Sequence, residues 1–526
     1  MWHQGYMPVA GSLGWSAAVA ALPVFVLLYL LGMRRTAAWI ASLAALAASA
    51  LVALVVYGMP AGAVAGALTY GAAFGLFPIG WIVFSAILLY RLTVESGKFE
   101  VLKNLIGSLT ADQRLQALLI AFAFGAFLEG AAGFGTPVAV AAAMLAGLGF
   151  SPFYAAAICL LANTAPVAFG SIGIPIVTLA GVTGLPAAQL SAWVGRICAP
   201  VSLIVPAYLV WVMGGWTALR GVAWAAALCG VSFASVQFLV SNFIGPQLTD
   251  ILSSLAAMAA LVAWLLISRK KTKPLARVSQ PLTAWAPYAL LVVFVLLWGW
   301  APVHRALDRV TVMFPWPALH NAVWRVPPVV PQPAPYPAQY TFNWLAAAGT
   351  ACVAAALLSA VLLRVPARKL AEVAVSTARQ LLLPLVTIAT VLGLAFLMNY
   401  SGATATLGLA FAQTGGLFPF FSALLGWLGV FLTGSDTSAN ALFGNLQVIT
   451  ANRLGFSPVL MAAANSAGGV MGKMISLQSI AVACAAAGLG RQDEANLFRF
   501  TLRHSLALAA LIGLITMAYA YLGGGV

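Results

Sequence analysis

The sequence predicts an all-α polytopic membrane protein with inverted repeats, each containing a re-entrant hairpin and a broken transmembrane helix. Three observations predict this class: the composition, the positions of the basic residues and an internal repeat. Of the 526 residues, 63% are hydrophobic and only 7% are charged, and the mean hydropathy is +1.01. A soluble domain needs far more polar surface, so the lipid bilayer is the expected solvent. We expect 1–526 to form one integral membrane domain.

The net charge of +15 is explained by position and does not indicate a nucleic-acid partner. The basic residues cluster in the joints between apolar stretches, which is the positive-inside signal of cytoplasmic loops. Binding to nucleic acid is therefore not expected. The clusters are Arg34 and Arg35; Arg91, Lys98, Lys103 and Arg114; Arg269, Lys270, Lys271, Lys273 and Arg277; Arg364, Arg368 and Lys369; and Arg491, Arg499 and Arg503.

Cysteine and histidine show no ligand pattern. The cysteines lie inside apolar stretches without CxxC spacing, which is typical of small packing residues, and the histidines have no metal-ligand spacing. We therefore expect no disulfide, no metal site and no cofactor. The residues are Cys159, Cys198, Cys229, Cys352 and Cys484, and His3, His304, His320 and His504.

The first half of the chain alternates apolar spans with basic joints. The first apolar run is expected to be a retained span, because the residues before it lack a basic region and a small-residue cleavage site. Between the basic segments 91–115 and 269–277 the chain must cross the membrane an even number of times, and four spans fit. The stretch 116–149 should therefore be a re-entrant hairpin opened from the cytoplasm. The expected spans lie near 14–32, 37–57, 63–90, 153–178, 190–213, 219–242 and 250–268.

The arrangement of the second half follows from the same count of membrane crossings between basic segments. The proline-rich segment 301–341 is predicted to be an external loop, mostly extended or polyproline-like. Between the basic block at Arg364 and the one at Arg491, 415–454 is expected to be a second hairpin, this time opened from outside. Both termini are then outside. The expected spans lie near 284–300, 343–363, 380–398, 458–487 and 504–522.

Short segments recur in the same order in both halves. Each copy has an FLxG segment, then LGFSP, then an ANxA segment, and a glycine seven residues after the Asn. Two copies of opposite orientation form the inverted-repeat plan of secondary transporters, in which the substrate site lies near the midplane. We expect repeats at about 63–268 and 343–526. The matching segments are 127–130, 148–152, 162–165 and Gly170 in the first copy, and 431–434, 454–458, 464–467 and Gly472 in the second.

Glu129 precedes the glycine-rich stretch GAAGFGTP (130–137) in the first hairpin. An ionisable group at membrane depth is costly and indicates a functional site by default. The glycines interrupt the helix, and a new helix can begin at the proline with free N–H groups that suit a small carboxylate. Gly133, Gly135 and Thr136 are the candidate contacts. The alternative is a seam of close helix packing.

Asp436 lies in GSDTSAN (434–440), the expected tip of the second hairpin. The hydroxyls, amide and carboxylate of this stretch suit either Na⁺ coordination or a proton relay. Ser435 and Thr437 are candidate substrate contacts. The alternative is structural, because Asp436 or Ser435 can cap the helix that follows.

The two broken spans follow the hairpins. Asn residues there can both donate and accept hydrogen bonds. A lysine inside an apolar broken helix requires an anion nearby, either a hairpin carboxylate or the substrate, unless it reaches out to the membrane interface. The candidate substrate contacts are Asn163, Thr164 and Ser171 in ANTAPVAFGSIGIP (162–175), and Asn465 and Lys473 in ANSAGGVMGKMIS (464–476).

Several long segments resemble the bacterial lactate permease family, which includes the glycolate permeases. The resemblance covers most of 1–526 and implies uptake of L-lactate, often also of D-lactate and glycolate, in symport with protons across the bacterial inner membrane. Both termini are then expected in the periplasm. The chain is also similar to a wider ion-transporter superfamily with paired hairpins, elevator-like motion and frequent dimers, so a homodimer is one expected assembly. The matching segments are AFLEGAAGFGTPVAV, LLANTAPVAFGSIGIPI, SNFIGPQLTDILSSL, LGWLGVFLTGSDTSANALF, ANSAGGVMGKMISLQSIA and LFRFTLRHS.

These residues together suggest a mechanism. We expect the lactate carboxylate to dock between the hairpin tips within reach of Lys473, with Glu129 and Asp436 as the proton carriers. Protonation of one carboxylate would free Lys473 for the substrate anion. The repeat alignment sets Glu129 against Thr433, so the two carboxylates are expected to have unequal roles, with Glu129 the better candidate for the proton.

Two other functions stay open. A sodium-coupled carboxylate symporter or exchanger would use the same hairpins with GSDTS as the cation site. An intramembrane enzyme is disfavoured because no second catalytic motif accompanies Asp436. The sequence does not rank lactate against glycolate.

Overall fold

The computed structural model describes residues 1–133, 135–268 and 281–522, which are mostly helical. Within them, ten helices are long and apolar enough to cross a membrane, or up to twelve if each of two bent helix pairs is one span. The pairs are Pro152–Ala162 with Val167–Thr183, bent by 63°, and Thr283–Gly299 with Ala301–Val310, bent by 79°. The all-α membrane class predicted from the sequence is therefore confirmed.

The first spans lie close to their predicted positions. Helix α2 continues through a π-helical turn to Val56, and a similar turn with non-helical backbone at Phe77 joins α3 to α4. The basic residues of the next joint lie on two short helices. The helices are α1 (Leu13–Gly32), α2 (Ala38–Leu51), α3 (Ala61–Phe74), α4 (Trp81–Glu95), α5 (Lys98–Gly107) and α6 (Gln113–Gln116).

Residues 113–147 form a helical hairpin, which we call hairpin 1. Its first arm runs from α6 through a π-helical stretch into α7 (Gly125–Ala131), and its second arm is α8 (Thr136–Gly147). Between the arms, Gly133 and Gly135 have φ of 59° and 82°. Only glycine adopts this left-handed backbone at no steric cost, so these two residues make the tight turn.

The spans that follow hairpin 1 include one pair that is joined without a separate loop. The predicted spans 190–213 and 219–242 both lie in the element α11, which leaves helical geometry at Gly214 and Gly215, directly after the first predicted span, and again at Val222. The basic block Arg269–Arg277 lies outside the described residues. The helices are α9 (Pro152–Ala162), α10 (Gly170–Thr183), α11 (Ala187–Phe243), α12 (Thr249–Ser268) and α13 (Pro281–Gly299).

The proline-rich loop is more ordered than predicted. Instead of a mostly polyproline-like chain, 301–341 contains a short helix and strands of two small sheets, one of which includes the amino-terminal strand. Strand β2 pairs with β5, and β3 pairs with both β4 and β1. Such pairing satisfies backbone groups between distant segments, and local periodicity cannot show it. The elements are α14 (Ala301–Leu307), β1 (Trp2–His3), β2 (Val312–Pro315), β3 (Val323–Arg325), β4 (Ala334–Pro335) and β5 (Gln339–Phe342).

The carboxy-terminal half contains a second helical hairpin, hairpin 2, formed by α18 and α19 with a turn at Gly434 and Ser435. The span predicted at 380–398 is longer and starts at Ala367. The span predicted at 458–487 breaks at 474–476, directly after Lys473. The helices are α15 (Ala348–Leu362), α16 (Ala367–Ser401), α17 (Ala403–Phe411), α18 (Phe418–Thr433), α19 (Asp436–Leu454), α20 (Pro458–Lys473), α21 (Leu477–Ala487) and α22 (Arg491–Leu522).

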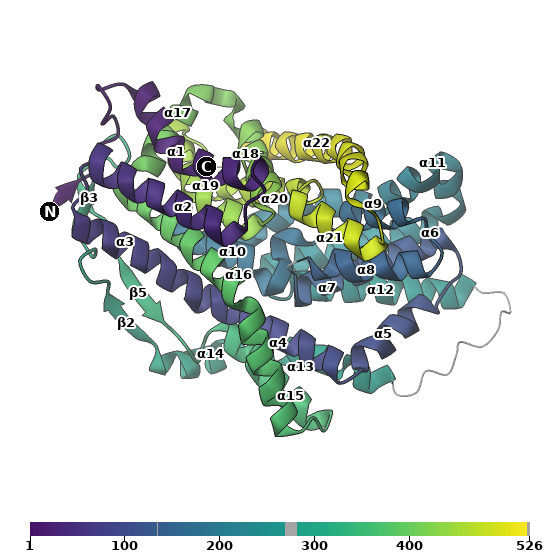
Figure 1. Cartoon of the computed structure of the whole chain (residues 1–526). Coiled ribbons are helices and arrows are strands. Elements are labelled where there is room, and N and C mark those ends of the chain that lie inside the picture. The colour runs from purple at the N-terminus through teal and green to yellow at the C-terminus, as the bar shows by residue number, and fades with distance from the viewer. Residues whose placement is uncertain (134, 269–280, 523–526) are drawn as a thin grey trace.

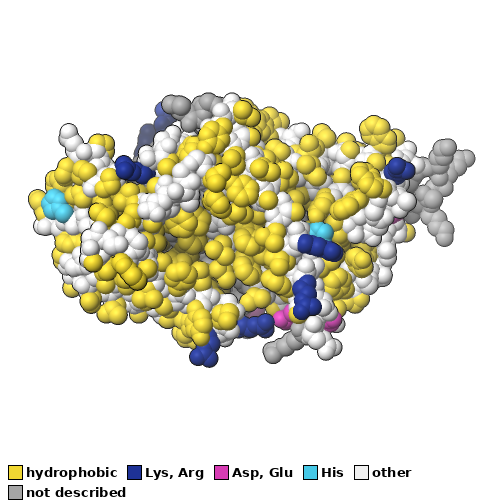
Figure 2. All heavy atoms as spheres, turned by 90° about the horizontal axis from the view of Figure 1, so that it is seen from above, with side chains coloured by type: hydrophobic (Ala, Val, Ile, Leu, Met, Phe, Trp, Pro, Cys, Tyr) yellow, Lys and Arg dark blue, Asp and Glu magenta, His cyan; other side chains and the backbone are white. Residues whose placement is uncertain are grey.

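The strands and the amino terminus gather at one end of the molecule, and α5 and α6 lie at the other (Figure 1). Figure 2 shows a face covered mostly by hydrophobic side chains, with few Lys and Arg residues. Among the exposed side chains, Trp224 and Ile267 are 82% and 85% exposed. Exposed apolar surface on this scale is expected where a protein contacts lipid.

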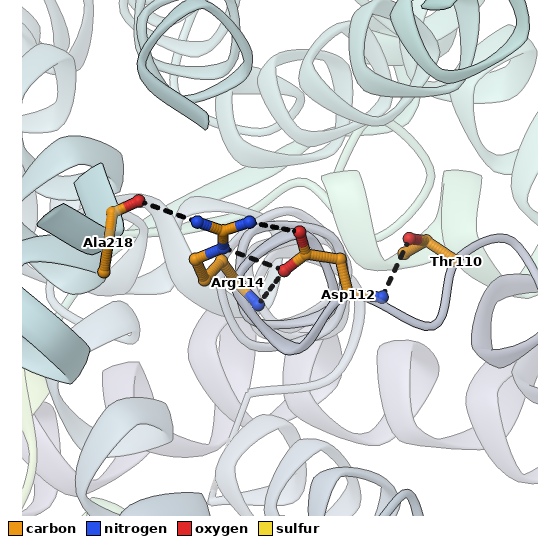
Figure 3. A network of polar contacts seen from close by, with 4 residues as sticks. All are labelled: Thr110, Asp112, Arg114 and Ala218. Carbon is orange, nitrogen blue, oxygen red and sulfur yellow. Dashed lines mark hydrogen bonds and ion pairs between the residues drawn. The ribbon is translucent and has the colours of Figure 1, made fainter. Parts of the chain in front are cut away.

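Asp112, just before hairpin 1, ties the start of the hairpin to α11. Its carboxylate accepts the backbone N–H of Arg114 at 2.9 Å and pairs with the Arg114 guanidinium at 2.6 Å (Figure 3). The guanidinium also donates to the carbonyl of Ala218 at 3.2 Å. The side-chain hydrogen bond from Arg114 lowers the pKa of Asp112. The resulting stability is complete above the ordinary aspartate pKa of about 4 and is lost as the pH falls through the lowered value.

We expect Asp112→Ala to lower the midpoint of thermal unfolding in detergent by a few degrees. The change removes a helix cap and an ion pair, together worth about 1–3 kcal/mol. Glu100→Ala is the matched control, because its pair with Lys103 lies at 2.8 Å on an exposed surface and such pairs contribute less than about 1 kcal/mol. Tryptophan fluorescence during heating measures both variants, and equal shifts would contradict the role of Asp112.

Candidate functional site

The tips of the two hairpins and the breaks in the two spans after them border one cavity of about 420 Å³, which we call the central cavity. Helices α2, α4 and α16 complete its wall. Seven of the residues singled out in the sequence line it: Glu129, Thr136, Ser171, Ser435, Asp436, Thr437 and Lys473. Gly133, Gly135, Asn163, Thr164 and Asn465 are not among its described lining residues.

Glu129 lies at the end of the first arm of hairpin 1 and is 5% exposed. Its Oε1 is so close to Gly170 that a Cβ atom there would be 2.8 Å away, and a Cβ on Gly133 would be 3.5 Å away. Within the described chain, its Oε2 has no hydrogen-bond partner. The carboxyl group is therefore held in a close glycine-lined space at the edge of the cavity, with one oxygen unpaired.

Two polar residues of the first broken span, Ser171 and Asn163, lie beside this carboxyl. The hydroxyl of Ser171 donates to the carbonyl of Ala132 at 3.0 Å, which joins the broken span to hairpin 1. The Asn163 side chain lies next to Glu129, and neither of its polar atoms makes a well-formed hydrogen bond in the described residues. The Thr164 hydroxyl donates to the carbonyl of Leu161 at 2.7 Å, and Thr164 is not part of the described lining of the cavity.

At the tip of hairpin 2, Ser435 caps α19 by accepting the backbone N–H of Ser438 at 3.3 Å. The capping role therefore belongs to Ser435. Asp436 is buried, and its Oδ2 accepts hydrogen bonds from Ser466 at 2.6 Å and Asn440 at 3.3 Å. The bond from Ser466 ties the hairpin to α20, whereas Asn440 lies on α19 itself. Oδ1 of Asp436 has no partner among the described residues.

Asn465 is fully buried in the middle of α20, eight residues before its end. It donates to the side-chain oxygen of Asn440 at 3.0 Å and accepts from the Gln447 amide at 3.0 Å. Its counterpart Asn163 lies directly at the break after α9. The two asparagines are thus placed differently, although their sequence segments match.

Lys473 ends α20 at the wall of the central cavity. Its ammonium donates to the carbonyl of Gly434 at the tip of hairpin 2, at 2.7 Å. It interacts electrostatically with both Glu129 and Asp436, yet among the described side chains it forms no ion pair within 4.0 Å. Lys473 is therefore near both carboxylates and forms an ion pair within 4.0 Å with neither of them.

Sequence reasoning missed several polar groups of the site. Thr433, Ser438 and Gln478 adjoin the tip of hairpin 2, and Gln380 and Thr387 reach the cavity from α16. The tip residues could have been found from their nearness to GSDTSAN, but the α16 residues could not, because only tertiary packing brings that helix alongside.

Asp250 was also missed. It is 1% exposed in the first turn of α12, and its two oxygens have no hydrogen-bond partner in the part of the chain that the structure describes. Its Cβ packs against Gly130, next to Glu129. It does not border the central cavity in the described lining. The signal in the sequence was a third carboxylate near an apolar span, in SNFIGPQLTDILSSL.

The described residues contain no group of three or more His, Cys, Asp and Glu side chains that could hold a metal ion. The site instead offers hydroxyls, amides, two carboxylates and one ammonium between broken helices. Such a cavity in a multi-span helical protein is typical of a membrane transporter.

Comparison with known proteins assigns the chain to a family. The family profile "L-lactate permease" matches residues 16–523. The sequence is 46% identical over 550 residues to the L-lactate permease of Bacillus subtilis (98% of both chains), and 44% identical over 556 residues to the glycolate permease GlcA of Escherichia coli (100% of this chain, 99% of the relative). The chain belongs to the L-lactate permease family, and it is a transporter and not an enzyme.

Among solved structures, the chain is similar to Neisseria gonorrhoeae MtrF, with a TM-score of 0.44 and 15% identity over 86% of this chain and 83% of that one. It is also similar to the Alcanivorax borkumensis YdaH transporter, with a TM-score of 0.43 and 15% identity over 87% of both chains.

Proposed function

We propose that this chain imports L-lactate, and also D-lactate and glycolate, in symport with protons across the bacterial inner membrane. The observation that carries the proposal is Lys473, the one cation among the described residues that line the central cavity. A carboxylate in a low-dielectric cavity requires such a partner. The names of two full-length relatives, an L-lactate permease and a glycolate permease, support the substrate class.

The geometry supports a direct role for both hairpins. Among the described residues, the ammonium of Lys473 makes a hydrogen bond to the Gly434 carbonyl and no ion pair, so an incoming substrate carboxylate can become its charge partner. The hydroxyls of Thr136, Ser435 and Thr437 border the same space and can bind the substrate hydroxyl or its second carboxylate oxygen.

Coupling requires a group that gains and loses a proton as the substrate binds. We assign this role to Glu129, because no side-chain hydrogen bond holds its carboxyl within the described chain, whereas Asp436, although its Oδ1 is also unpaired, accepts hydrogen bonds from Ser466 and Asn440 through Oδ2. When Glu129 is protonated, Lys473 loses one competing anion and attracts the substrate more strongly. Asp436 then serves to hold hairpin 2 against α20.

The wider architecture forms part of the same proposal. Two repeats of opposite orientation, hairpins entered from opposite sides, periplasmic termini, elevator-like motion and a homodimer together give alternating access. The amino terminus and the loop strands lie together at one end of the molecule, which supports placing both on the same side of the membrane (Figure 1). A cysteine at Gln332 that reacts with an impermeant reagent from outside would test this orientation.

Uptake by purified protein in proteoliposomes tests the function. Labelled L-lactate should accumulate against its gradient when the interior is alkaline, and unlabelled glycolate and D-lactate should compete. Absence of lactate and glycolate uptake under any gradient would overturn the proposal.

A sodium-coupled carboxylate transporter is the second candidate. It is favoured by the oxygen-rich tip of hairpin 2, where Thr433, Ser435 and Asp436 lie together. Uptake that requires Na⁺ and ignores the pH gradient would establish it.

A further inference from the structure

A second cavity, of about 400 Å³, lies at the end of the molecule that carries the strands, and we call it the outer cavity. Helices α3, α10, α16 and α19 border it together with the loop that contains β3. Its described lining has no acidic residue. Its polar side chains include Tyr70, Arg325, Asn399, Tyr400, Asn445 and Asn452.

Arg325 is the one cation in this described lining, and its charge is not neutralised there. The guanidinium packs over the ring of Tyr336, at 4.6 Å from the ring centroid. It forms no ion pair in the described chain, and its buried Nε has no hydrogen-bond partner. A partly desolvated arginine without a counter-charge is a strong receptor for a carboxylate, which it can bind through two parallel hydrogen bonds.

The opposite wall offers amide groups. Asn445 and Asn452 are seven residues, or two turns, apart on α19, so they lie on the same face of the helix. Both line the cavity, and the described structure gives their side chains no hydrogen bond. An amide can donate to a carboxylate and also accept from a hydroxyl. The wall therefore suits a small anion that carries both groups.

The same three helices, α10, α16 and α19, border both cavities. Helix α16 borders the central cavity at Ile388 and the outer cavity at Phe396, which are separated by about 12 Å at 1.5 Å per residue. Helices α10 and α19 also reach from one cavity to the other. Between α16 and α10, the Asn399 amide donates to the carbonyl of Val182 at 3.4 Å. A ligand in the outer cavity is thus aligned with the path to the central cavity.

We propose that the outer cavity is a capture site for the substrate anion, in which Arg325 binds the carboxylate of a small 2-hydroxycarboxylate before it moves to the central cavity. The inference rests on the proposed function for the identity of the anion. It places the site on the periplasmic side, with the loop strands and the amino terminus.

Transport kinetics in right-side-out vesicles test the site. Arg325→Gln should raise the KM for external L-lactate about tenfold and leave the maximal rate within twofold, since it removes a charge-assisted contact made before the transport step. Arg325→Lys keeps the charge and should restore part of the affinity. In inside-out vesicles, the KM of Arg325→Gln should match that of the wild type.

The matched control is Arg309→Gln, which removes the same charge from an exposed position in the same loop. An equal rise in KM for both variants would overturn the proposal, because it would show only a general surface potential. An unchanged KM in Arg325→Gln, or a shift seen only from the inside, would also overturn it. If the wild type transports neither lactate nor glycolate, the proposed function fails, and this is distinguishable from a site defect.

A binding measurement keeps the test independent of transport. The native cysteines are all buried, so Asn452→Cys provides a single accessible thiol at the outer cavity. L-lactate should slow its modification by an impermeant maleimide, and Arg325→Gln in the same chain should abolish this protection. Protection that persists without Arg325, or no protection in the parent, would contradict the capture site.

Discussion

Lys473→Gln is expected to reduce lactate uptake at least 100-fold. Removing one partner of a buried charge pair costs about 3–5 kcal/mol, which is roughly two to three and a half orders of magnitude in binding at about 1.4 kcal/mol per tenfold. The substrate carboxylate would enter a central cavity whose described lining retains two carboxylates and no cation. Initial uptake rates over a wide range of substrate concentration measure the loss.

The loss must be separated from damage to hairpin 2, because Lys473 also donates to the Gly434 carbonyl. The midpoint temperature of thermal unfolding in detergent should fall by only a few degrees, since one hydrogen bond from a charged group contributes about 1.5–3 kcal/mol to stability. Lys103→Gln, which alters an exposed lysine paired with Glu100, should retain wild-type uptake. Uptake by Lys473→Gln within twofold of wild type would show that Lys473 does not bind the substrate.

Glu129→Gln is expected to separate binding from coupling. Glutamine has nearly the same shape as glutamate, so it fits the close space beside Gly170, but it cannot release a proton. Exchange of labelled for unlabelled lactate at equal concentrations should persist. Accumulation driven by a pH gradient should fall to the level without a gradient, as measured in proteoliposomes with a defined interior pH.

Glu372→Gln supplies the control for this prediction. It makes the same carboxylate-to-amide change in an exposed side chain that pairs with Arg368 and is not part of the described lining of the central cavity. We expect it to keep pH-driven accumulation. If Glu129→Gln accumulates lactate as the wild type does, Glu129 is not the proton carrier, and Asp436→Asn becomes the next variant to measure.

Much of the helical plan was predictable because its signals are local. Apolar length gives the spans, and the paired glycines at 133 and 135 end one arm of hairpin 1 where the sequence indicated a break. In α11 the backbone leaves helical geometry at Gly214 and Gly215, between the two predicted spans, although no separate loop joins them.

The candidate site was predictable only in part. Glu129, Asp436 and Lys473 are ionisable groups in apolar surroundings, and this rarity alone marked them. The matching sequence segments suggested that Asn465 and Asn163 are equivalent. However, α20 continues past Asn465, and the Asn465 side chain forms hydrogen bonds with Asn440 and Gln447. Asp250 was missed because its closeness to Glu129 follows from the packing of α12 against hairpin 1, more than a hundred residues away in sequence.

The parallel pairing of β1 with β3 constrains the order in which the chain can assemble during synthesis. Trp2 and His3 pair with Val323 and Trp324, so the amino terminus finds its strand partner only after more than 300 further residues are made. At roughly 5–20 residues per second, this delay is about 15–60 s. The first span must therefore be inserted and oriented before its amino-terminal segment docks, and the outer layer of the protein closes late in biogenesis.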